Sequence, residues 1–269
     1  MKNKIFDCVT FFNENFQLNL RFNVLYNYVD KFVICESKFD HLGQPKNLNF
    51  KIEEFANFKD KIDYIILDHQ FPNIIDPWKT QAYQREFMLK NLKDANQNDY
   101  IFFSDPDEIP RPEILINFEL KKKYGIFLQD CFNYKFNLFN PYETPWEGTR
   151  VAKKKNLKSI DFMRQEVKRK NLNYSFYRFD KEKSIQIFNK GGWHFNNIMT
   201  PSEISKKLKT FAHQEFSKKE FSSIKVIEEK ISKKVDLFDR GHKYRIIKID
   251  NSFPKFLKQN YNKYKDYIL

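Results

Sequence analysis

The sequence that decides the fold is Asp99-Tyr100-Ile101-Phe102-Phe103-Ser104-Asp105-Pro106-Asp107-Glu108-Ile109-Pro110. Residues 100–103 form a short apolar run that predicts a buried strand. Three acidic residues follow within four positions, and Pro106, which has no amide proton, bends the chain among them. Ligands of open α/β sheets bind at the carboxyl ends of strands, so we expect this acidic turn to lie in a binding site.

The acidic turn is a candidate metal site. Asp105 and Asp107 stand two positions apart, and carboxylate oxygens gathered in this way bind Mg²⁺ or Mn²⁺, which usually carries a substrate phosphate. The same D-x-D pattern is common in loops, where it forms a solvated acidic turn before a helix. Glu108 either supports the site from behind or caps the next helix, and we favour the cap.

The chain alternates between strand and helix patterns. We predict strands at 5–12, 32–35, 62–67 and 100–103, helices at 13–29, 52–58, 79–92 and 112–123, and a β-rich stretch at 126–139. This alternation predicts an α/β fold with a mostly parallel, Rossmann-like sheet that is flanked by helices. Two capping boxes, at 200–203 and 217–220, predict further helices in the second half of the chain.

The charge divides the chain into two halves. Residues 1–150 contain 19 Lys and Arg against 22 Asp and Glu, whereas residues 151–269 contain 29 against 13. A basic lobe beside an acidic metal site suits an anionic partner, such as a nucleotide diphosphate, a lipid-linked phosphate, a membrane surface or a nucleic acid. We expect a single domain over 1–269, with the change between its halves near 140–150.

Three cysteines, Cys8, Cys35 and Cys131, form no C-x-x-C pair. A sparse, odd number argues against a disulfide framework and for a reducing compartment. The sequence contains neither the apolar region of a signal peptide nor an apolar run of about 20 residues that would span a membrane. We therefore expect a cytoplasmic protein, with peripheral contact between its basic half and the inner membrane surface.

Several blocks together resemble glycosyltransferase family 17. They are 7–14, 29–37, 43–46, 67–69, Arg85, 104–110, 192–195, 200–201 and 253–257. The D-x-D-E-I-P and G-W-H blocks, in this order, are the most specific part, and the resemblance extends over nearly the whole chain. The best-known members of this family are the β-1,4-mannosyl-glycoprotein 4-β-N-acetylglucosaminyltransferases, which add a bisecting N-acetylglucosamine.

The resemblance implies a GT-A fold and a metal-dependent, inverting transfer of a sugar from a nucleotide sugar to a glycan hydroxyl. The expected donor is UDP-linked N-acetylglucosamine (UDP-GlcNAc), the expected cofactor is Mn²⁺ or Mg²⁺, and the expected acceptor is an oligosaccharide or a lipid-linked glycan. Residues 1–139 would bind nucleotide and metal, and 140–269 would form a helical, basic acceptor lobe. The membrane anchor and luminal stem of the animal members have no counterpart, so we expect bacterial or viral surface-glycan synthesis.

The resemblance and the strand ends together suggest the donor site. Asp105 and Asp107 would hold the metal, with Asp105 also reaching the ribose, and His194 would be a further ligand rather than a structural histidine. Arg85 would bind the diphosphate through its guanidinium fork or form a salt bridge on a solvated face. Three more residues end strands where a nucleoside would lie, with strand capping as the alternative: Glu36, Ser37 and Asp68.

An inverting transferase also needs a carboxylate that acts as general base on the acceptor hydroxyl. The first candidate is Glu147, which follows Trp146, an aromatic residue that would stack on a sugar. Asp130, at the end of a strand, is the second candidate, and Glu215 is the third.

Two other function classes stay open. A metal-dependent nuclease or phosphotransferase also uses clustered acids beside a basic lobe. A non-enzymatic nucleic-acid-binding protein needs a basic, aromatic platform, which the acidic first half fits poorly. We therefore expect glycosyl transfer and no nucleic-acid partner.

Overall fold

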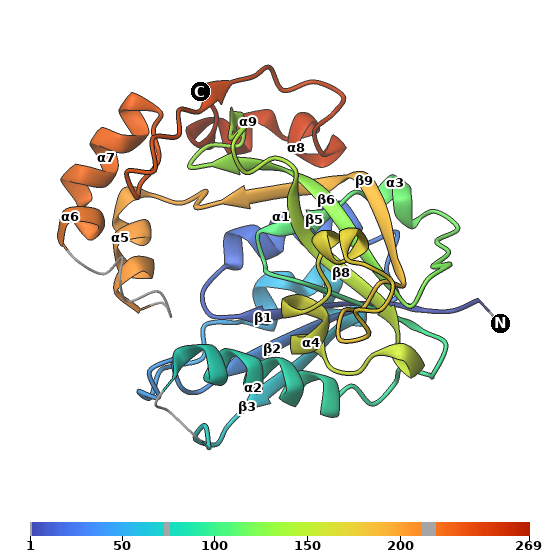
Figure 1. Ribbon diagram of the computed structural model, residues 1–269. Helices are drawn as coiled ribbons and strands as arrows, with labels where there is room; N and C mark the ends of the chain where they lie inside the picture. Colours follow the sequence, from blue (N-terminus) through green and yellow to red (C-terminus); the bar gives the residue numbers. More distant parts are fainter. Residues whose placement is uncertain (1, 73–75, 211–218) are drawn as a thin grey trace.

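The computed structural model describes residues 2–72, 76–210 and 219–269. Their strands form a sheet in the order β10-β7-β6-β8-β4-β1-β2-β3, and β9 pairs with both β5 and β6 (Figure 1). One sheet therefore connects the beginning of the chain with its basic second half.

The first half of the sheet is parallel. Its strands are β1 (Ile5–Phe11), β2 (Lys31–Ser37), β3 (Ile62–Leu67) and β4 (Tyr100–Ser104). Strand β1 pairs in parallel with β2 on one side and with β4 on the other, and β2 pairs in parallel with β3. The order β3-β2-β1-β4 is that of a Rossmann nucleotide-binding half, which confirms the predicted α/β architecture.

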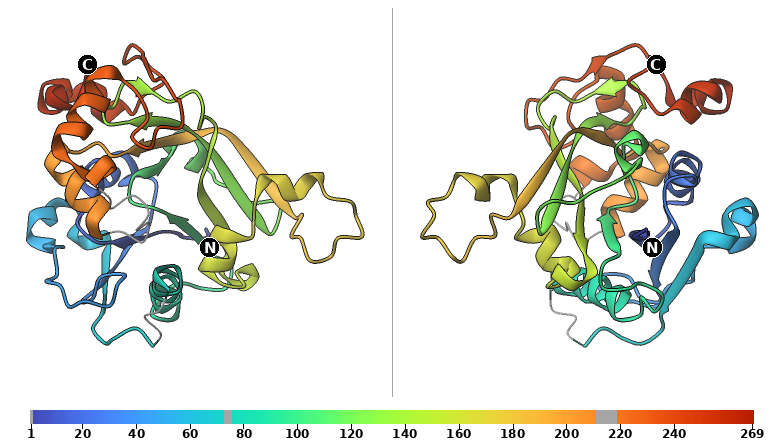
Figure 2. Two further views of the ribbon diagram at one scale, coloured as in Figure 1. Left: turned by 60° about the vertical axis from the view of Figure 1, so that its left-hand side comes forward. Right: turned by 90° about the vertical axis from the view of Figure 1, so that its right-hand side faces the viewer.

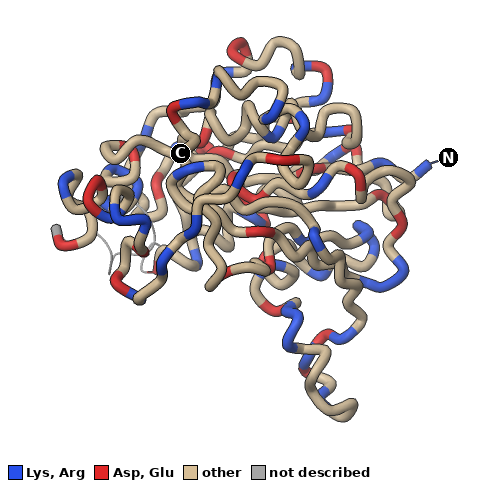
Figure 3. Tube along the Cα trace, turned by 90° about the horizontal axis from the view of Figure 1, so that it is seen from above, with Lys and Arg blue, Asp and Glu red and all other residues tan. Residues whose placement is uncertain are grey.

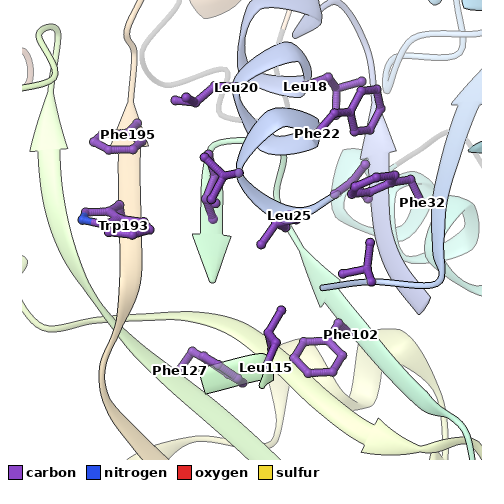
Figure 4. Packing of buried hydrophobic residues seen from close by; sticks show 14 of the residues in the cluster. Leu18, Leu20, Phe22, Leu25, Phe32, Phe102, Leu115, Phe127, Trp193 and Phe195 are labelled. Atoms are coloured by element: carbon purple, nitrogen blue, oxygen red, sulfur yellow. The ribbon is translucent and has the colours of Figure 1, made fainter. Parts of the chain in front are cut away.

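Helices cover both faces of these strands. Successive side chains of a strand point to opposite faces. Phe102 accordingly belongs to the same hydrophobic cluster as Leu18, Phe22 and Leu25 of α1 (Asn15–Leu25), and Figure 4 shows Leu25 as the labelled residue of α1 nearest to it. On the other face, Phe103 packs with Met88 of α2 (Pro77–Lys90), together with helix α4 (Ile160–Gln165).

The second half of the sheet is mixed rather than parallel. Its strands are β5 (Glu108–Pro110), β6 (Tyr124–Asn133), β7 (Leu138–Phe139), β8 (Trp146–Lys153), β9 (Ile185–Asn196) and β10 (Arg245–Ile246). Strand β8 runs antiparallel to both β4 and β6, whereas β6 and β9 are parallel. Antiparallel neighbours need no crossover helix, and the second half departs from the predicted mostly parallel sheet except at the parallel pair β6 and β9.

The C-terminal part is helical, as the sequence predicts. Its helices are α5 (Pro201–Thr210), α6 (Lys219–Ser222), α7 (Ile224–Lys233), α8 (Lys255–Gln259) and α9 (Tyr261–Tyr264). The first predicted capping box is confirmed: Thr200 N donates to Glu203 Oε2 at 2.8 Å, and Glu203 N donates to Thr200 Oγ1 at 3.3 Å. The second begins at Ser217, which lies outside the described residues.

Two predicted helices differ from the structure. The segment at 112–123 contains only α3 (Pro112–Leu115), because Asn117 takes a left-handed φ of 53° that ends helical geometry. The segment at 52–58 is part of a 3-10 helix, η1 (Ile52–Lys61). Further 3-10 helices among the described residues are η2 (Lys154–Asn156), η3 (Arg169–Asn173) and η5 (Lys265–Tyr267). In the described parts of the chain, no helix has the length and hydropathy that a membrane span requires.

Candidate active site

A cavity of about 1130 Å³ lies at the carboxyl ends of the parallel strands. Thr10 from β1, Ser37 from β2 and the turn after β4 line one part of it. Residues 142–147, which lead into β8, and side chains of the C-terminal part line the other. The cavity is thus lined by residues from both halves of the chain.

The acidic turn lines this cavity. Strand β4 ends at Ser104 and β5 begins at Glu108, so Asp105 and Asp107 lie in the turn between the two strands. Strand β5 pairs with β9, with Glu108 opposite His194. This register brings His194 Nε2 to 3.6 Å from Asp107 Oδ1, although 87 positions separate the two residues in the sequence.

The aspartate and the histidine change each other's pKa. Burial alone would raise the pKa of Asp107, but the charges of His194 and Lys207 outweigh it and lower the pKa to about 2. Burial would lower the pKa of His194, and the carboxylate of Asp107 instead raises it well above its usual value. The indole ring of Trp146 lies over the imidazole with the ring centroids 4.8 Å apart, which fixes the plane of the ring.

An arginine from a distant helix holds the acidic turn. Arg164 Nη2, on α4, lies 2.6 Å from Asp105 Oδ2 and 2.7 Å from Glu108 Oε1. Glu108 is fully buried and also accepts hydrogen bonds from Trp146 Nε1 at 2.7 Å and from Asp105 N at 3.2 Å. The interpretation of Glu108 as a helix cap is therefore wrong: its carboxylate organises the turn from behind, and α3 begins after Arg111.

A second buried ion pair supports the same turn from the opposite side. Arg21, on α1, contacts Asp7 through two hydrogen bonds, Nε to Oδ2 at 2.6 Å and Nη2 to Oδ1 at 2.5 Å. Its third nitrogen, Nη1, donates to the backbone oxygen of Glu108 at 2.6 Å. The backbone and the side chain of Glu108 are thus both fixed by arginines, which pre-organises the two aspartates beside it.

The residues present fit a divalent cation only in part. In the described ranges, no group of three or more His, Cys, Asp or Glu side chains has the geometry of a metal site. Asp107 and His194 provide an oxygen and a nitrogen ligand 3.6 Å apart, close to the roughly 3 Å between neighbouring ligands of an octahedral ion. Asp105 instead faces Arg164. A cation here would therefore take its remaining ligands from a phosphate and water.

Two further carboxylates line the cavity on the side away from β1. Glu147 Oε2 accepts a hydrogen bond from Arg169 N at 3.0 Å and lies 3.3 Å from Arg150 Nη2. Glu143 Oε1 forms an ion pair with Arg240 at 2.7 Å. Among the cavity-lining residues there are eight Lys or Arg against five Asp or Glu, so the cavity favours an anionic ligand.

The family model of glycosyltransferase family 17 matches residues 1–265. This chain belongs to glycosyltransferase family 17. The observation agrees with the resemblance of its sequence blocks, and it favours glycosyl transfer over the nuclease and nucleic-acid-binding alternatives.

Curated family relatives match a shorter stretch. The human β-1,4-mannosyl-glycoprotein 4-β-N-acetylglucosaminyltransferase is 34% identical over 102 residues, which are 35% of this chain and 19% of the human protein. The mouse protein of the same name is 33% identical over a stretch with the same coverage. The match thus spans about a fifth of the length of these relatives.

Solved structures show weaker likenesses to this family 17 protein. Glucosyl-3-phosphoglycerate synthase of Mycobacterium tuberculosis is 10% identical, with a TM-score of 0.38, and the match covers 96% of this chain and 92% of that one. The Streptococcus pneumoniae glycosyltransferase GlyE is 11% identical, with a TM-score of 0.37 and coverages of 70% and 45%.

The structure brings six of the predicted site residues of this family 17 chain to the cavity: Ser37, Arg85, Asp105, Asp107, Glu147 and His194. Arg85 is buried and not on a solvated face, and its Nη1 pairs with Asp161 Oδ1 at 2.8 Å. Its Nε is buried and has no hydrogen-bond partner among the described residues, which leaves one donor for a ligand.

Three other predicted residues lie outside the cavity. Glu36 is fully buried and accepts hydrogen bonds from Lys46 Nζ and Tyr64 Oη, so it holds the loop after β2 in place. Asp68 is exposed, and its Oδ1 lies 3.4 Å from Nδ1 of the neighbouring His69. Asp130 pairs with Trp193 one register position before His194, so it points to the opposite face of the sheet. Glu215 lies outside the described residues.

Sequence reasoning missed several cavity residues, of which Arg164, Glu143 and Arg240 have the clearest contacts. Arg164 lies outside the sequence blocks that carry the resemblance and 59 positions from Asp105, so no local pattern relates the two. Trp146 was expected to stack on a sugar. In the structure its ring packs on His194, and its Nε1 donates a hydrogen bond to Glu108.

Proposed function

We propose that this protein transfers a sugar from a nucleoside-diphosphate sugar to a hydroxyl group of a glycan, with a divalent cation bound by Asp107 and His194. The observation that carries the proposal is this carboxylate–imidazole pair, at 3.6 Å, in a cation-rich cavity shared by the two halves of the chain. Membership in glycosyltransferase family 17 supports the reaction class.

The donor is proposed to bind over the parallel strands. Ser37 ends β2, and the Nε atom of Arg85 offers a hydrogen bond. Nucleotides bind at this edge in Rossmann-like sheets, and arginine suits a diphosphate. UDP-GlcNAc is the proposed donor because the curated relatives are named as N-acetylglucosaminyltransferases. Mn²⁺ or Mg²⁺ is the proposed cation, which would neutralise the charge that develops on the departing diphosphate.

The acceptor is proposed to bind on the side of residues 142–147. There the exposed ring of Tyr142 stacks on His242, with centroids 4.4 Å apart, and presents an aromatic surface at the cavity. Aromatic faces pack against the apolar faces of sugar rings. An oligosaccharide or a lipid-linked glycan is the proposed acceptor.

The chemistry proposed for this chain is a single displacement. Glu147 takes the proton of the acceptor hydroxyl while the hydroxyl oxygen bonds to the anomeric carbon and the bond from that carbon to the diphosphate oxygen breaks. Attack from the face opposite the leaving group inverts the anomeric configuration. Arg85, Arg164 and Lys207 line the cavity and provide positive charge near the acidic turn, where the leaving group gains negative charge.

Thermal unfolding of the purified protein with nucleotides and nucleotide sugars, with and without Mn²⁺, tests the proposal. A ligand that binds the folded state raises Tm by mass action. We expect a Mn²⁺-dependent rise with one nucleoside-diphosphate sugar that Asp107→Asn removes. Asp130→Asn is the matched control, because Asp130 lies outside the cavity and should leave the rise unchanged.

The proposal also predicts a product. Incubation of the protein with the donor that raises Tm, Mn²⁺ and glycan acceptors should release the nucleoside diphosphate, and EDTA should stop that release. If no nucleotide or nucleotide sugar raises Tm while single-stranded oligonucleotides do, the proposal is wrong and a nucleic-acid-binding function replaces it.

A further inference from the structure

An arm formed by residues 168–184 projects from the body of the molecule. It begins at the 3-10 helix η3 (Arg169–Asn173) and returns into β9 at Ile185. The two views in Figure 2 show it as the yellow segment that extends furthest from the sheet. Nothing in the proposed reaction accounts for the outer part of this arm.

The end of the arm exposes aromatic side chains. Phe176 is 85% exposed, Tyr177 is 62% exposed and Phe179 is 90% exposed. No other large hydrophobic residue in the described parts of the chain is more than 57% exposed. Three such residues within four positions form an apolar tip, which marks an interaction site rather than ordinary surface variation.

The tip has a defined backbone conformation. Lys183 Nζ donates to the backbone oxygen of Phe176 at 3.1 Å, and Arg178 N donates to Ser175 O at 3.0 Å. Phe179 N donates to Tyr177 O at 3.0 Å. These turns hold Phe176 and Phe179 outward, so their exposure is a property of the folded arm.

Positive charge lies behind the aromatic tip. The arm contains six Lys or Arg, three of them consecutive at 168–170, against two acids, Asp180 and Glu182. Arg178 and Asp180 neutralise each other through two hydrogen bonds of 2.7 Å. Figure 3 shows Lys and Arg along the sides of the projecting loop and uncharged residues at its end. The arm is therefore apolar at its end and basic along its length.

We propose that the arm docks this protein onto the surface of an anionic lipid bilayer. Phe176 and Phe179 would enter the region between headgroups and acyl chains, and Tyr177 would lie at the level of the headgroups. Arg169 and the two lysines of the outer part, Lys181 and Lys183, would contact the lipid phosphates. Aromatic residues combined with basic residues bind membrane surfaces in this layered way.

The layered order favours a bilayer over two other partners. Single-stranded nucleic acid needs aromatic rings and cations side by side along one groove, whereas Arg178, the cation between Tyr177 and Phe179, is neutralised by Asp180, and the three consecutive basic residues lie at the base of the arm, 168–170. Association with a second copy would bring together two chains of formal net charge +13. A bilayer presents charge outside and hydrocarbon inside, which matches both parts of the arm.

The base of the arm adjoins the cavity. Lys168 and Lys170 line it, and Arg169 N donates to Glu147 at 3.0 Å. A docked arm would bring the acceptor side of the cavity to the membrane surface. The docking surface does not depend on the proposed reaction, but together the two favour an acceptor carried by a lipid.

Vesicle flotation without any nucleotide tests the docking. The vesicles contain phosphatidylcholine alone or phosphatidylcholine with about a third of phosphatidylglycerol. We expect binding to the anionic vesicles that decreases with added NaCl. The affinity of the double variant Phe176→Ser/Phe179→Ser for these vesicles should decrease at least about 10-fold. The matched control, Ile224→Ser/Tyr261→Ser, removes side chains that are 46% and 48% exposed elsewhere and should bind as the parent does.

Three results would overturn the inference. They are equal binding by the arm variant and the parent, equal loss in the control variant, and absence of parent binding to anionic vesicles. If the parent binds oligonucleotides and the arm variant does not, the arm binds nucleic acid and not a bilayer. If sedimentation velocity shows a dimer of the parent that the arm variant no longer forms, the arm is a dimer interface and not a membrane-binding surface. Tm and donor binding of the arm variant should match the parent, which separates lost docking from lost folding and from failure of the proposed function.

Discussion

Arg164 Nη2 lies 2.7 Å from Glu108 Oε1, and this contact joins a helix of the second half to the fully buried carboxylate beneath the acidic turn. The same nitrogen lies 2.6 Å from Asp105. A buried carboxylate is costly without a partner, and Arg164 therefore couples the stability of the fold to the geometry of the site.

Replacing Arg164 by methionine should reduce both stability and donor binding. The change keeps most of the side-chain volume but leaves Glu108 with one fewer charged partner. We expect a loss of about 3–5 kcal/mol in the free energy of unfolding and a decrease in Tm of about 10 °C. Differential scanning calorimetry measures the loss of unfolding free energy and the decrease in Tm. The Mn²⁺-dependent rise in Tm with the donor measures donor binding.

The exposed pair Arg178–Asp180 provides the control for that measurement. Arg178→Met removes an ion pair that water already solvates, so Tm should not change measurably. If Arg164→Met also leaves Tm unchanged, the contact with Glu108 does not stabilise the fold and the structural role of Arg164 is wrong.

A glycine allows β5 to approach β9 closely. Gly192 has a φ of +140°, and a Cβ atom at this position would lie 2.1 Å from the backbone oxygen of Ile109. Gly192→Ala should therefore force the two strands apart and lower the free energy of unfolding by roughly 3 kcal/mol. Urea unfolding measures the loss.

Gly241→Ala is the matched control for this glycine. Gly241 also has a positive φ, +79°, but a Cβ atom would meet nothing within 4 Å. Gly241→Ala should lower the free energy of unfolding only by the backbone strain, about 1–2 kcal/mol. Equal losses in the two variants would mean that the close approach of Gly192 to Ile109 has no effect of its own.

Replacing Glu147 and replacing Glu143, the two carboxylates on the proposed acceptor side, should affect catalysis differently. Glu147→Gln should lower kcat by about 100-fold or more and leave the Mn²⁺-dependent donor binding intact, since it removes the proposed base. Glu143→Gln should have a smaller effect, because that carboxylate pairs with Arg240 at 2.7 Å. Steady-state kinetics of both variants measure the two decreases in kcat. A larger decrease for Glu143→Gln than for Glu147→Gln would assign the general base to Glu143.

The cysteines should be unreactive in the folded protein. All three are buried, and burial raises the pKa of Cys8 well above its usual value and the pKa of Cys35 to about 12. A raised pKa keeps the thiol protonated, so even pH of about 9, above the ordinary cysteine pKa, should not make these groups react with a disulfide reagent. Guanidinium should expose three thiols. Rapid labelling of Cys8 or Cys35 in the folded state would contradict their burial.

Parts of the fold follow directly from local sequence. The strand predicted at 62–67 matches β3, and the capping box at 200–203 marks the beginning of α5. Both appear in sequence as local patterns, a short apolar run for β3 and the Thr200–Glu203 capping box for α5. The helix at 112–123 was predicted too long because the left-handed φ of Asn117 follows no local pattern of hydrophobic residues.

The candidate site divides in the same way. The acidic turn and His194 were recognised because each lies in a distinctive block, and the cavity contains both. Glu36 was predicted to bind the nucleoside at the end of a strand; it does lie near the end of β2, but it is fully buried and bonded to Tyr64 and Lys46 instead of lining the cavity. Asp130 was chosen for its place at the end of a strand, whereas the pleat turned it away from the cavity.

The sequence by itself determined the α/β class, the acidic turn after a buried strand and the family, since these depend on short apolar runs and blocks of adjacent residues. Only the tertiary structure decided which charges meet. Arg164 reaches Asp105 across 59 positions and His194 reaches Asp107 across 87. Such contacts arise from strand register and helix packing, which bring together residues that no local pattern relates.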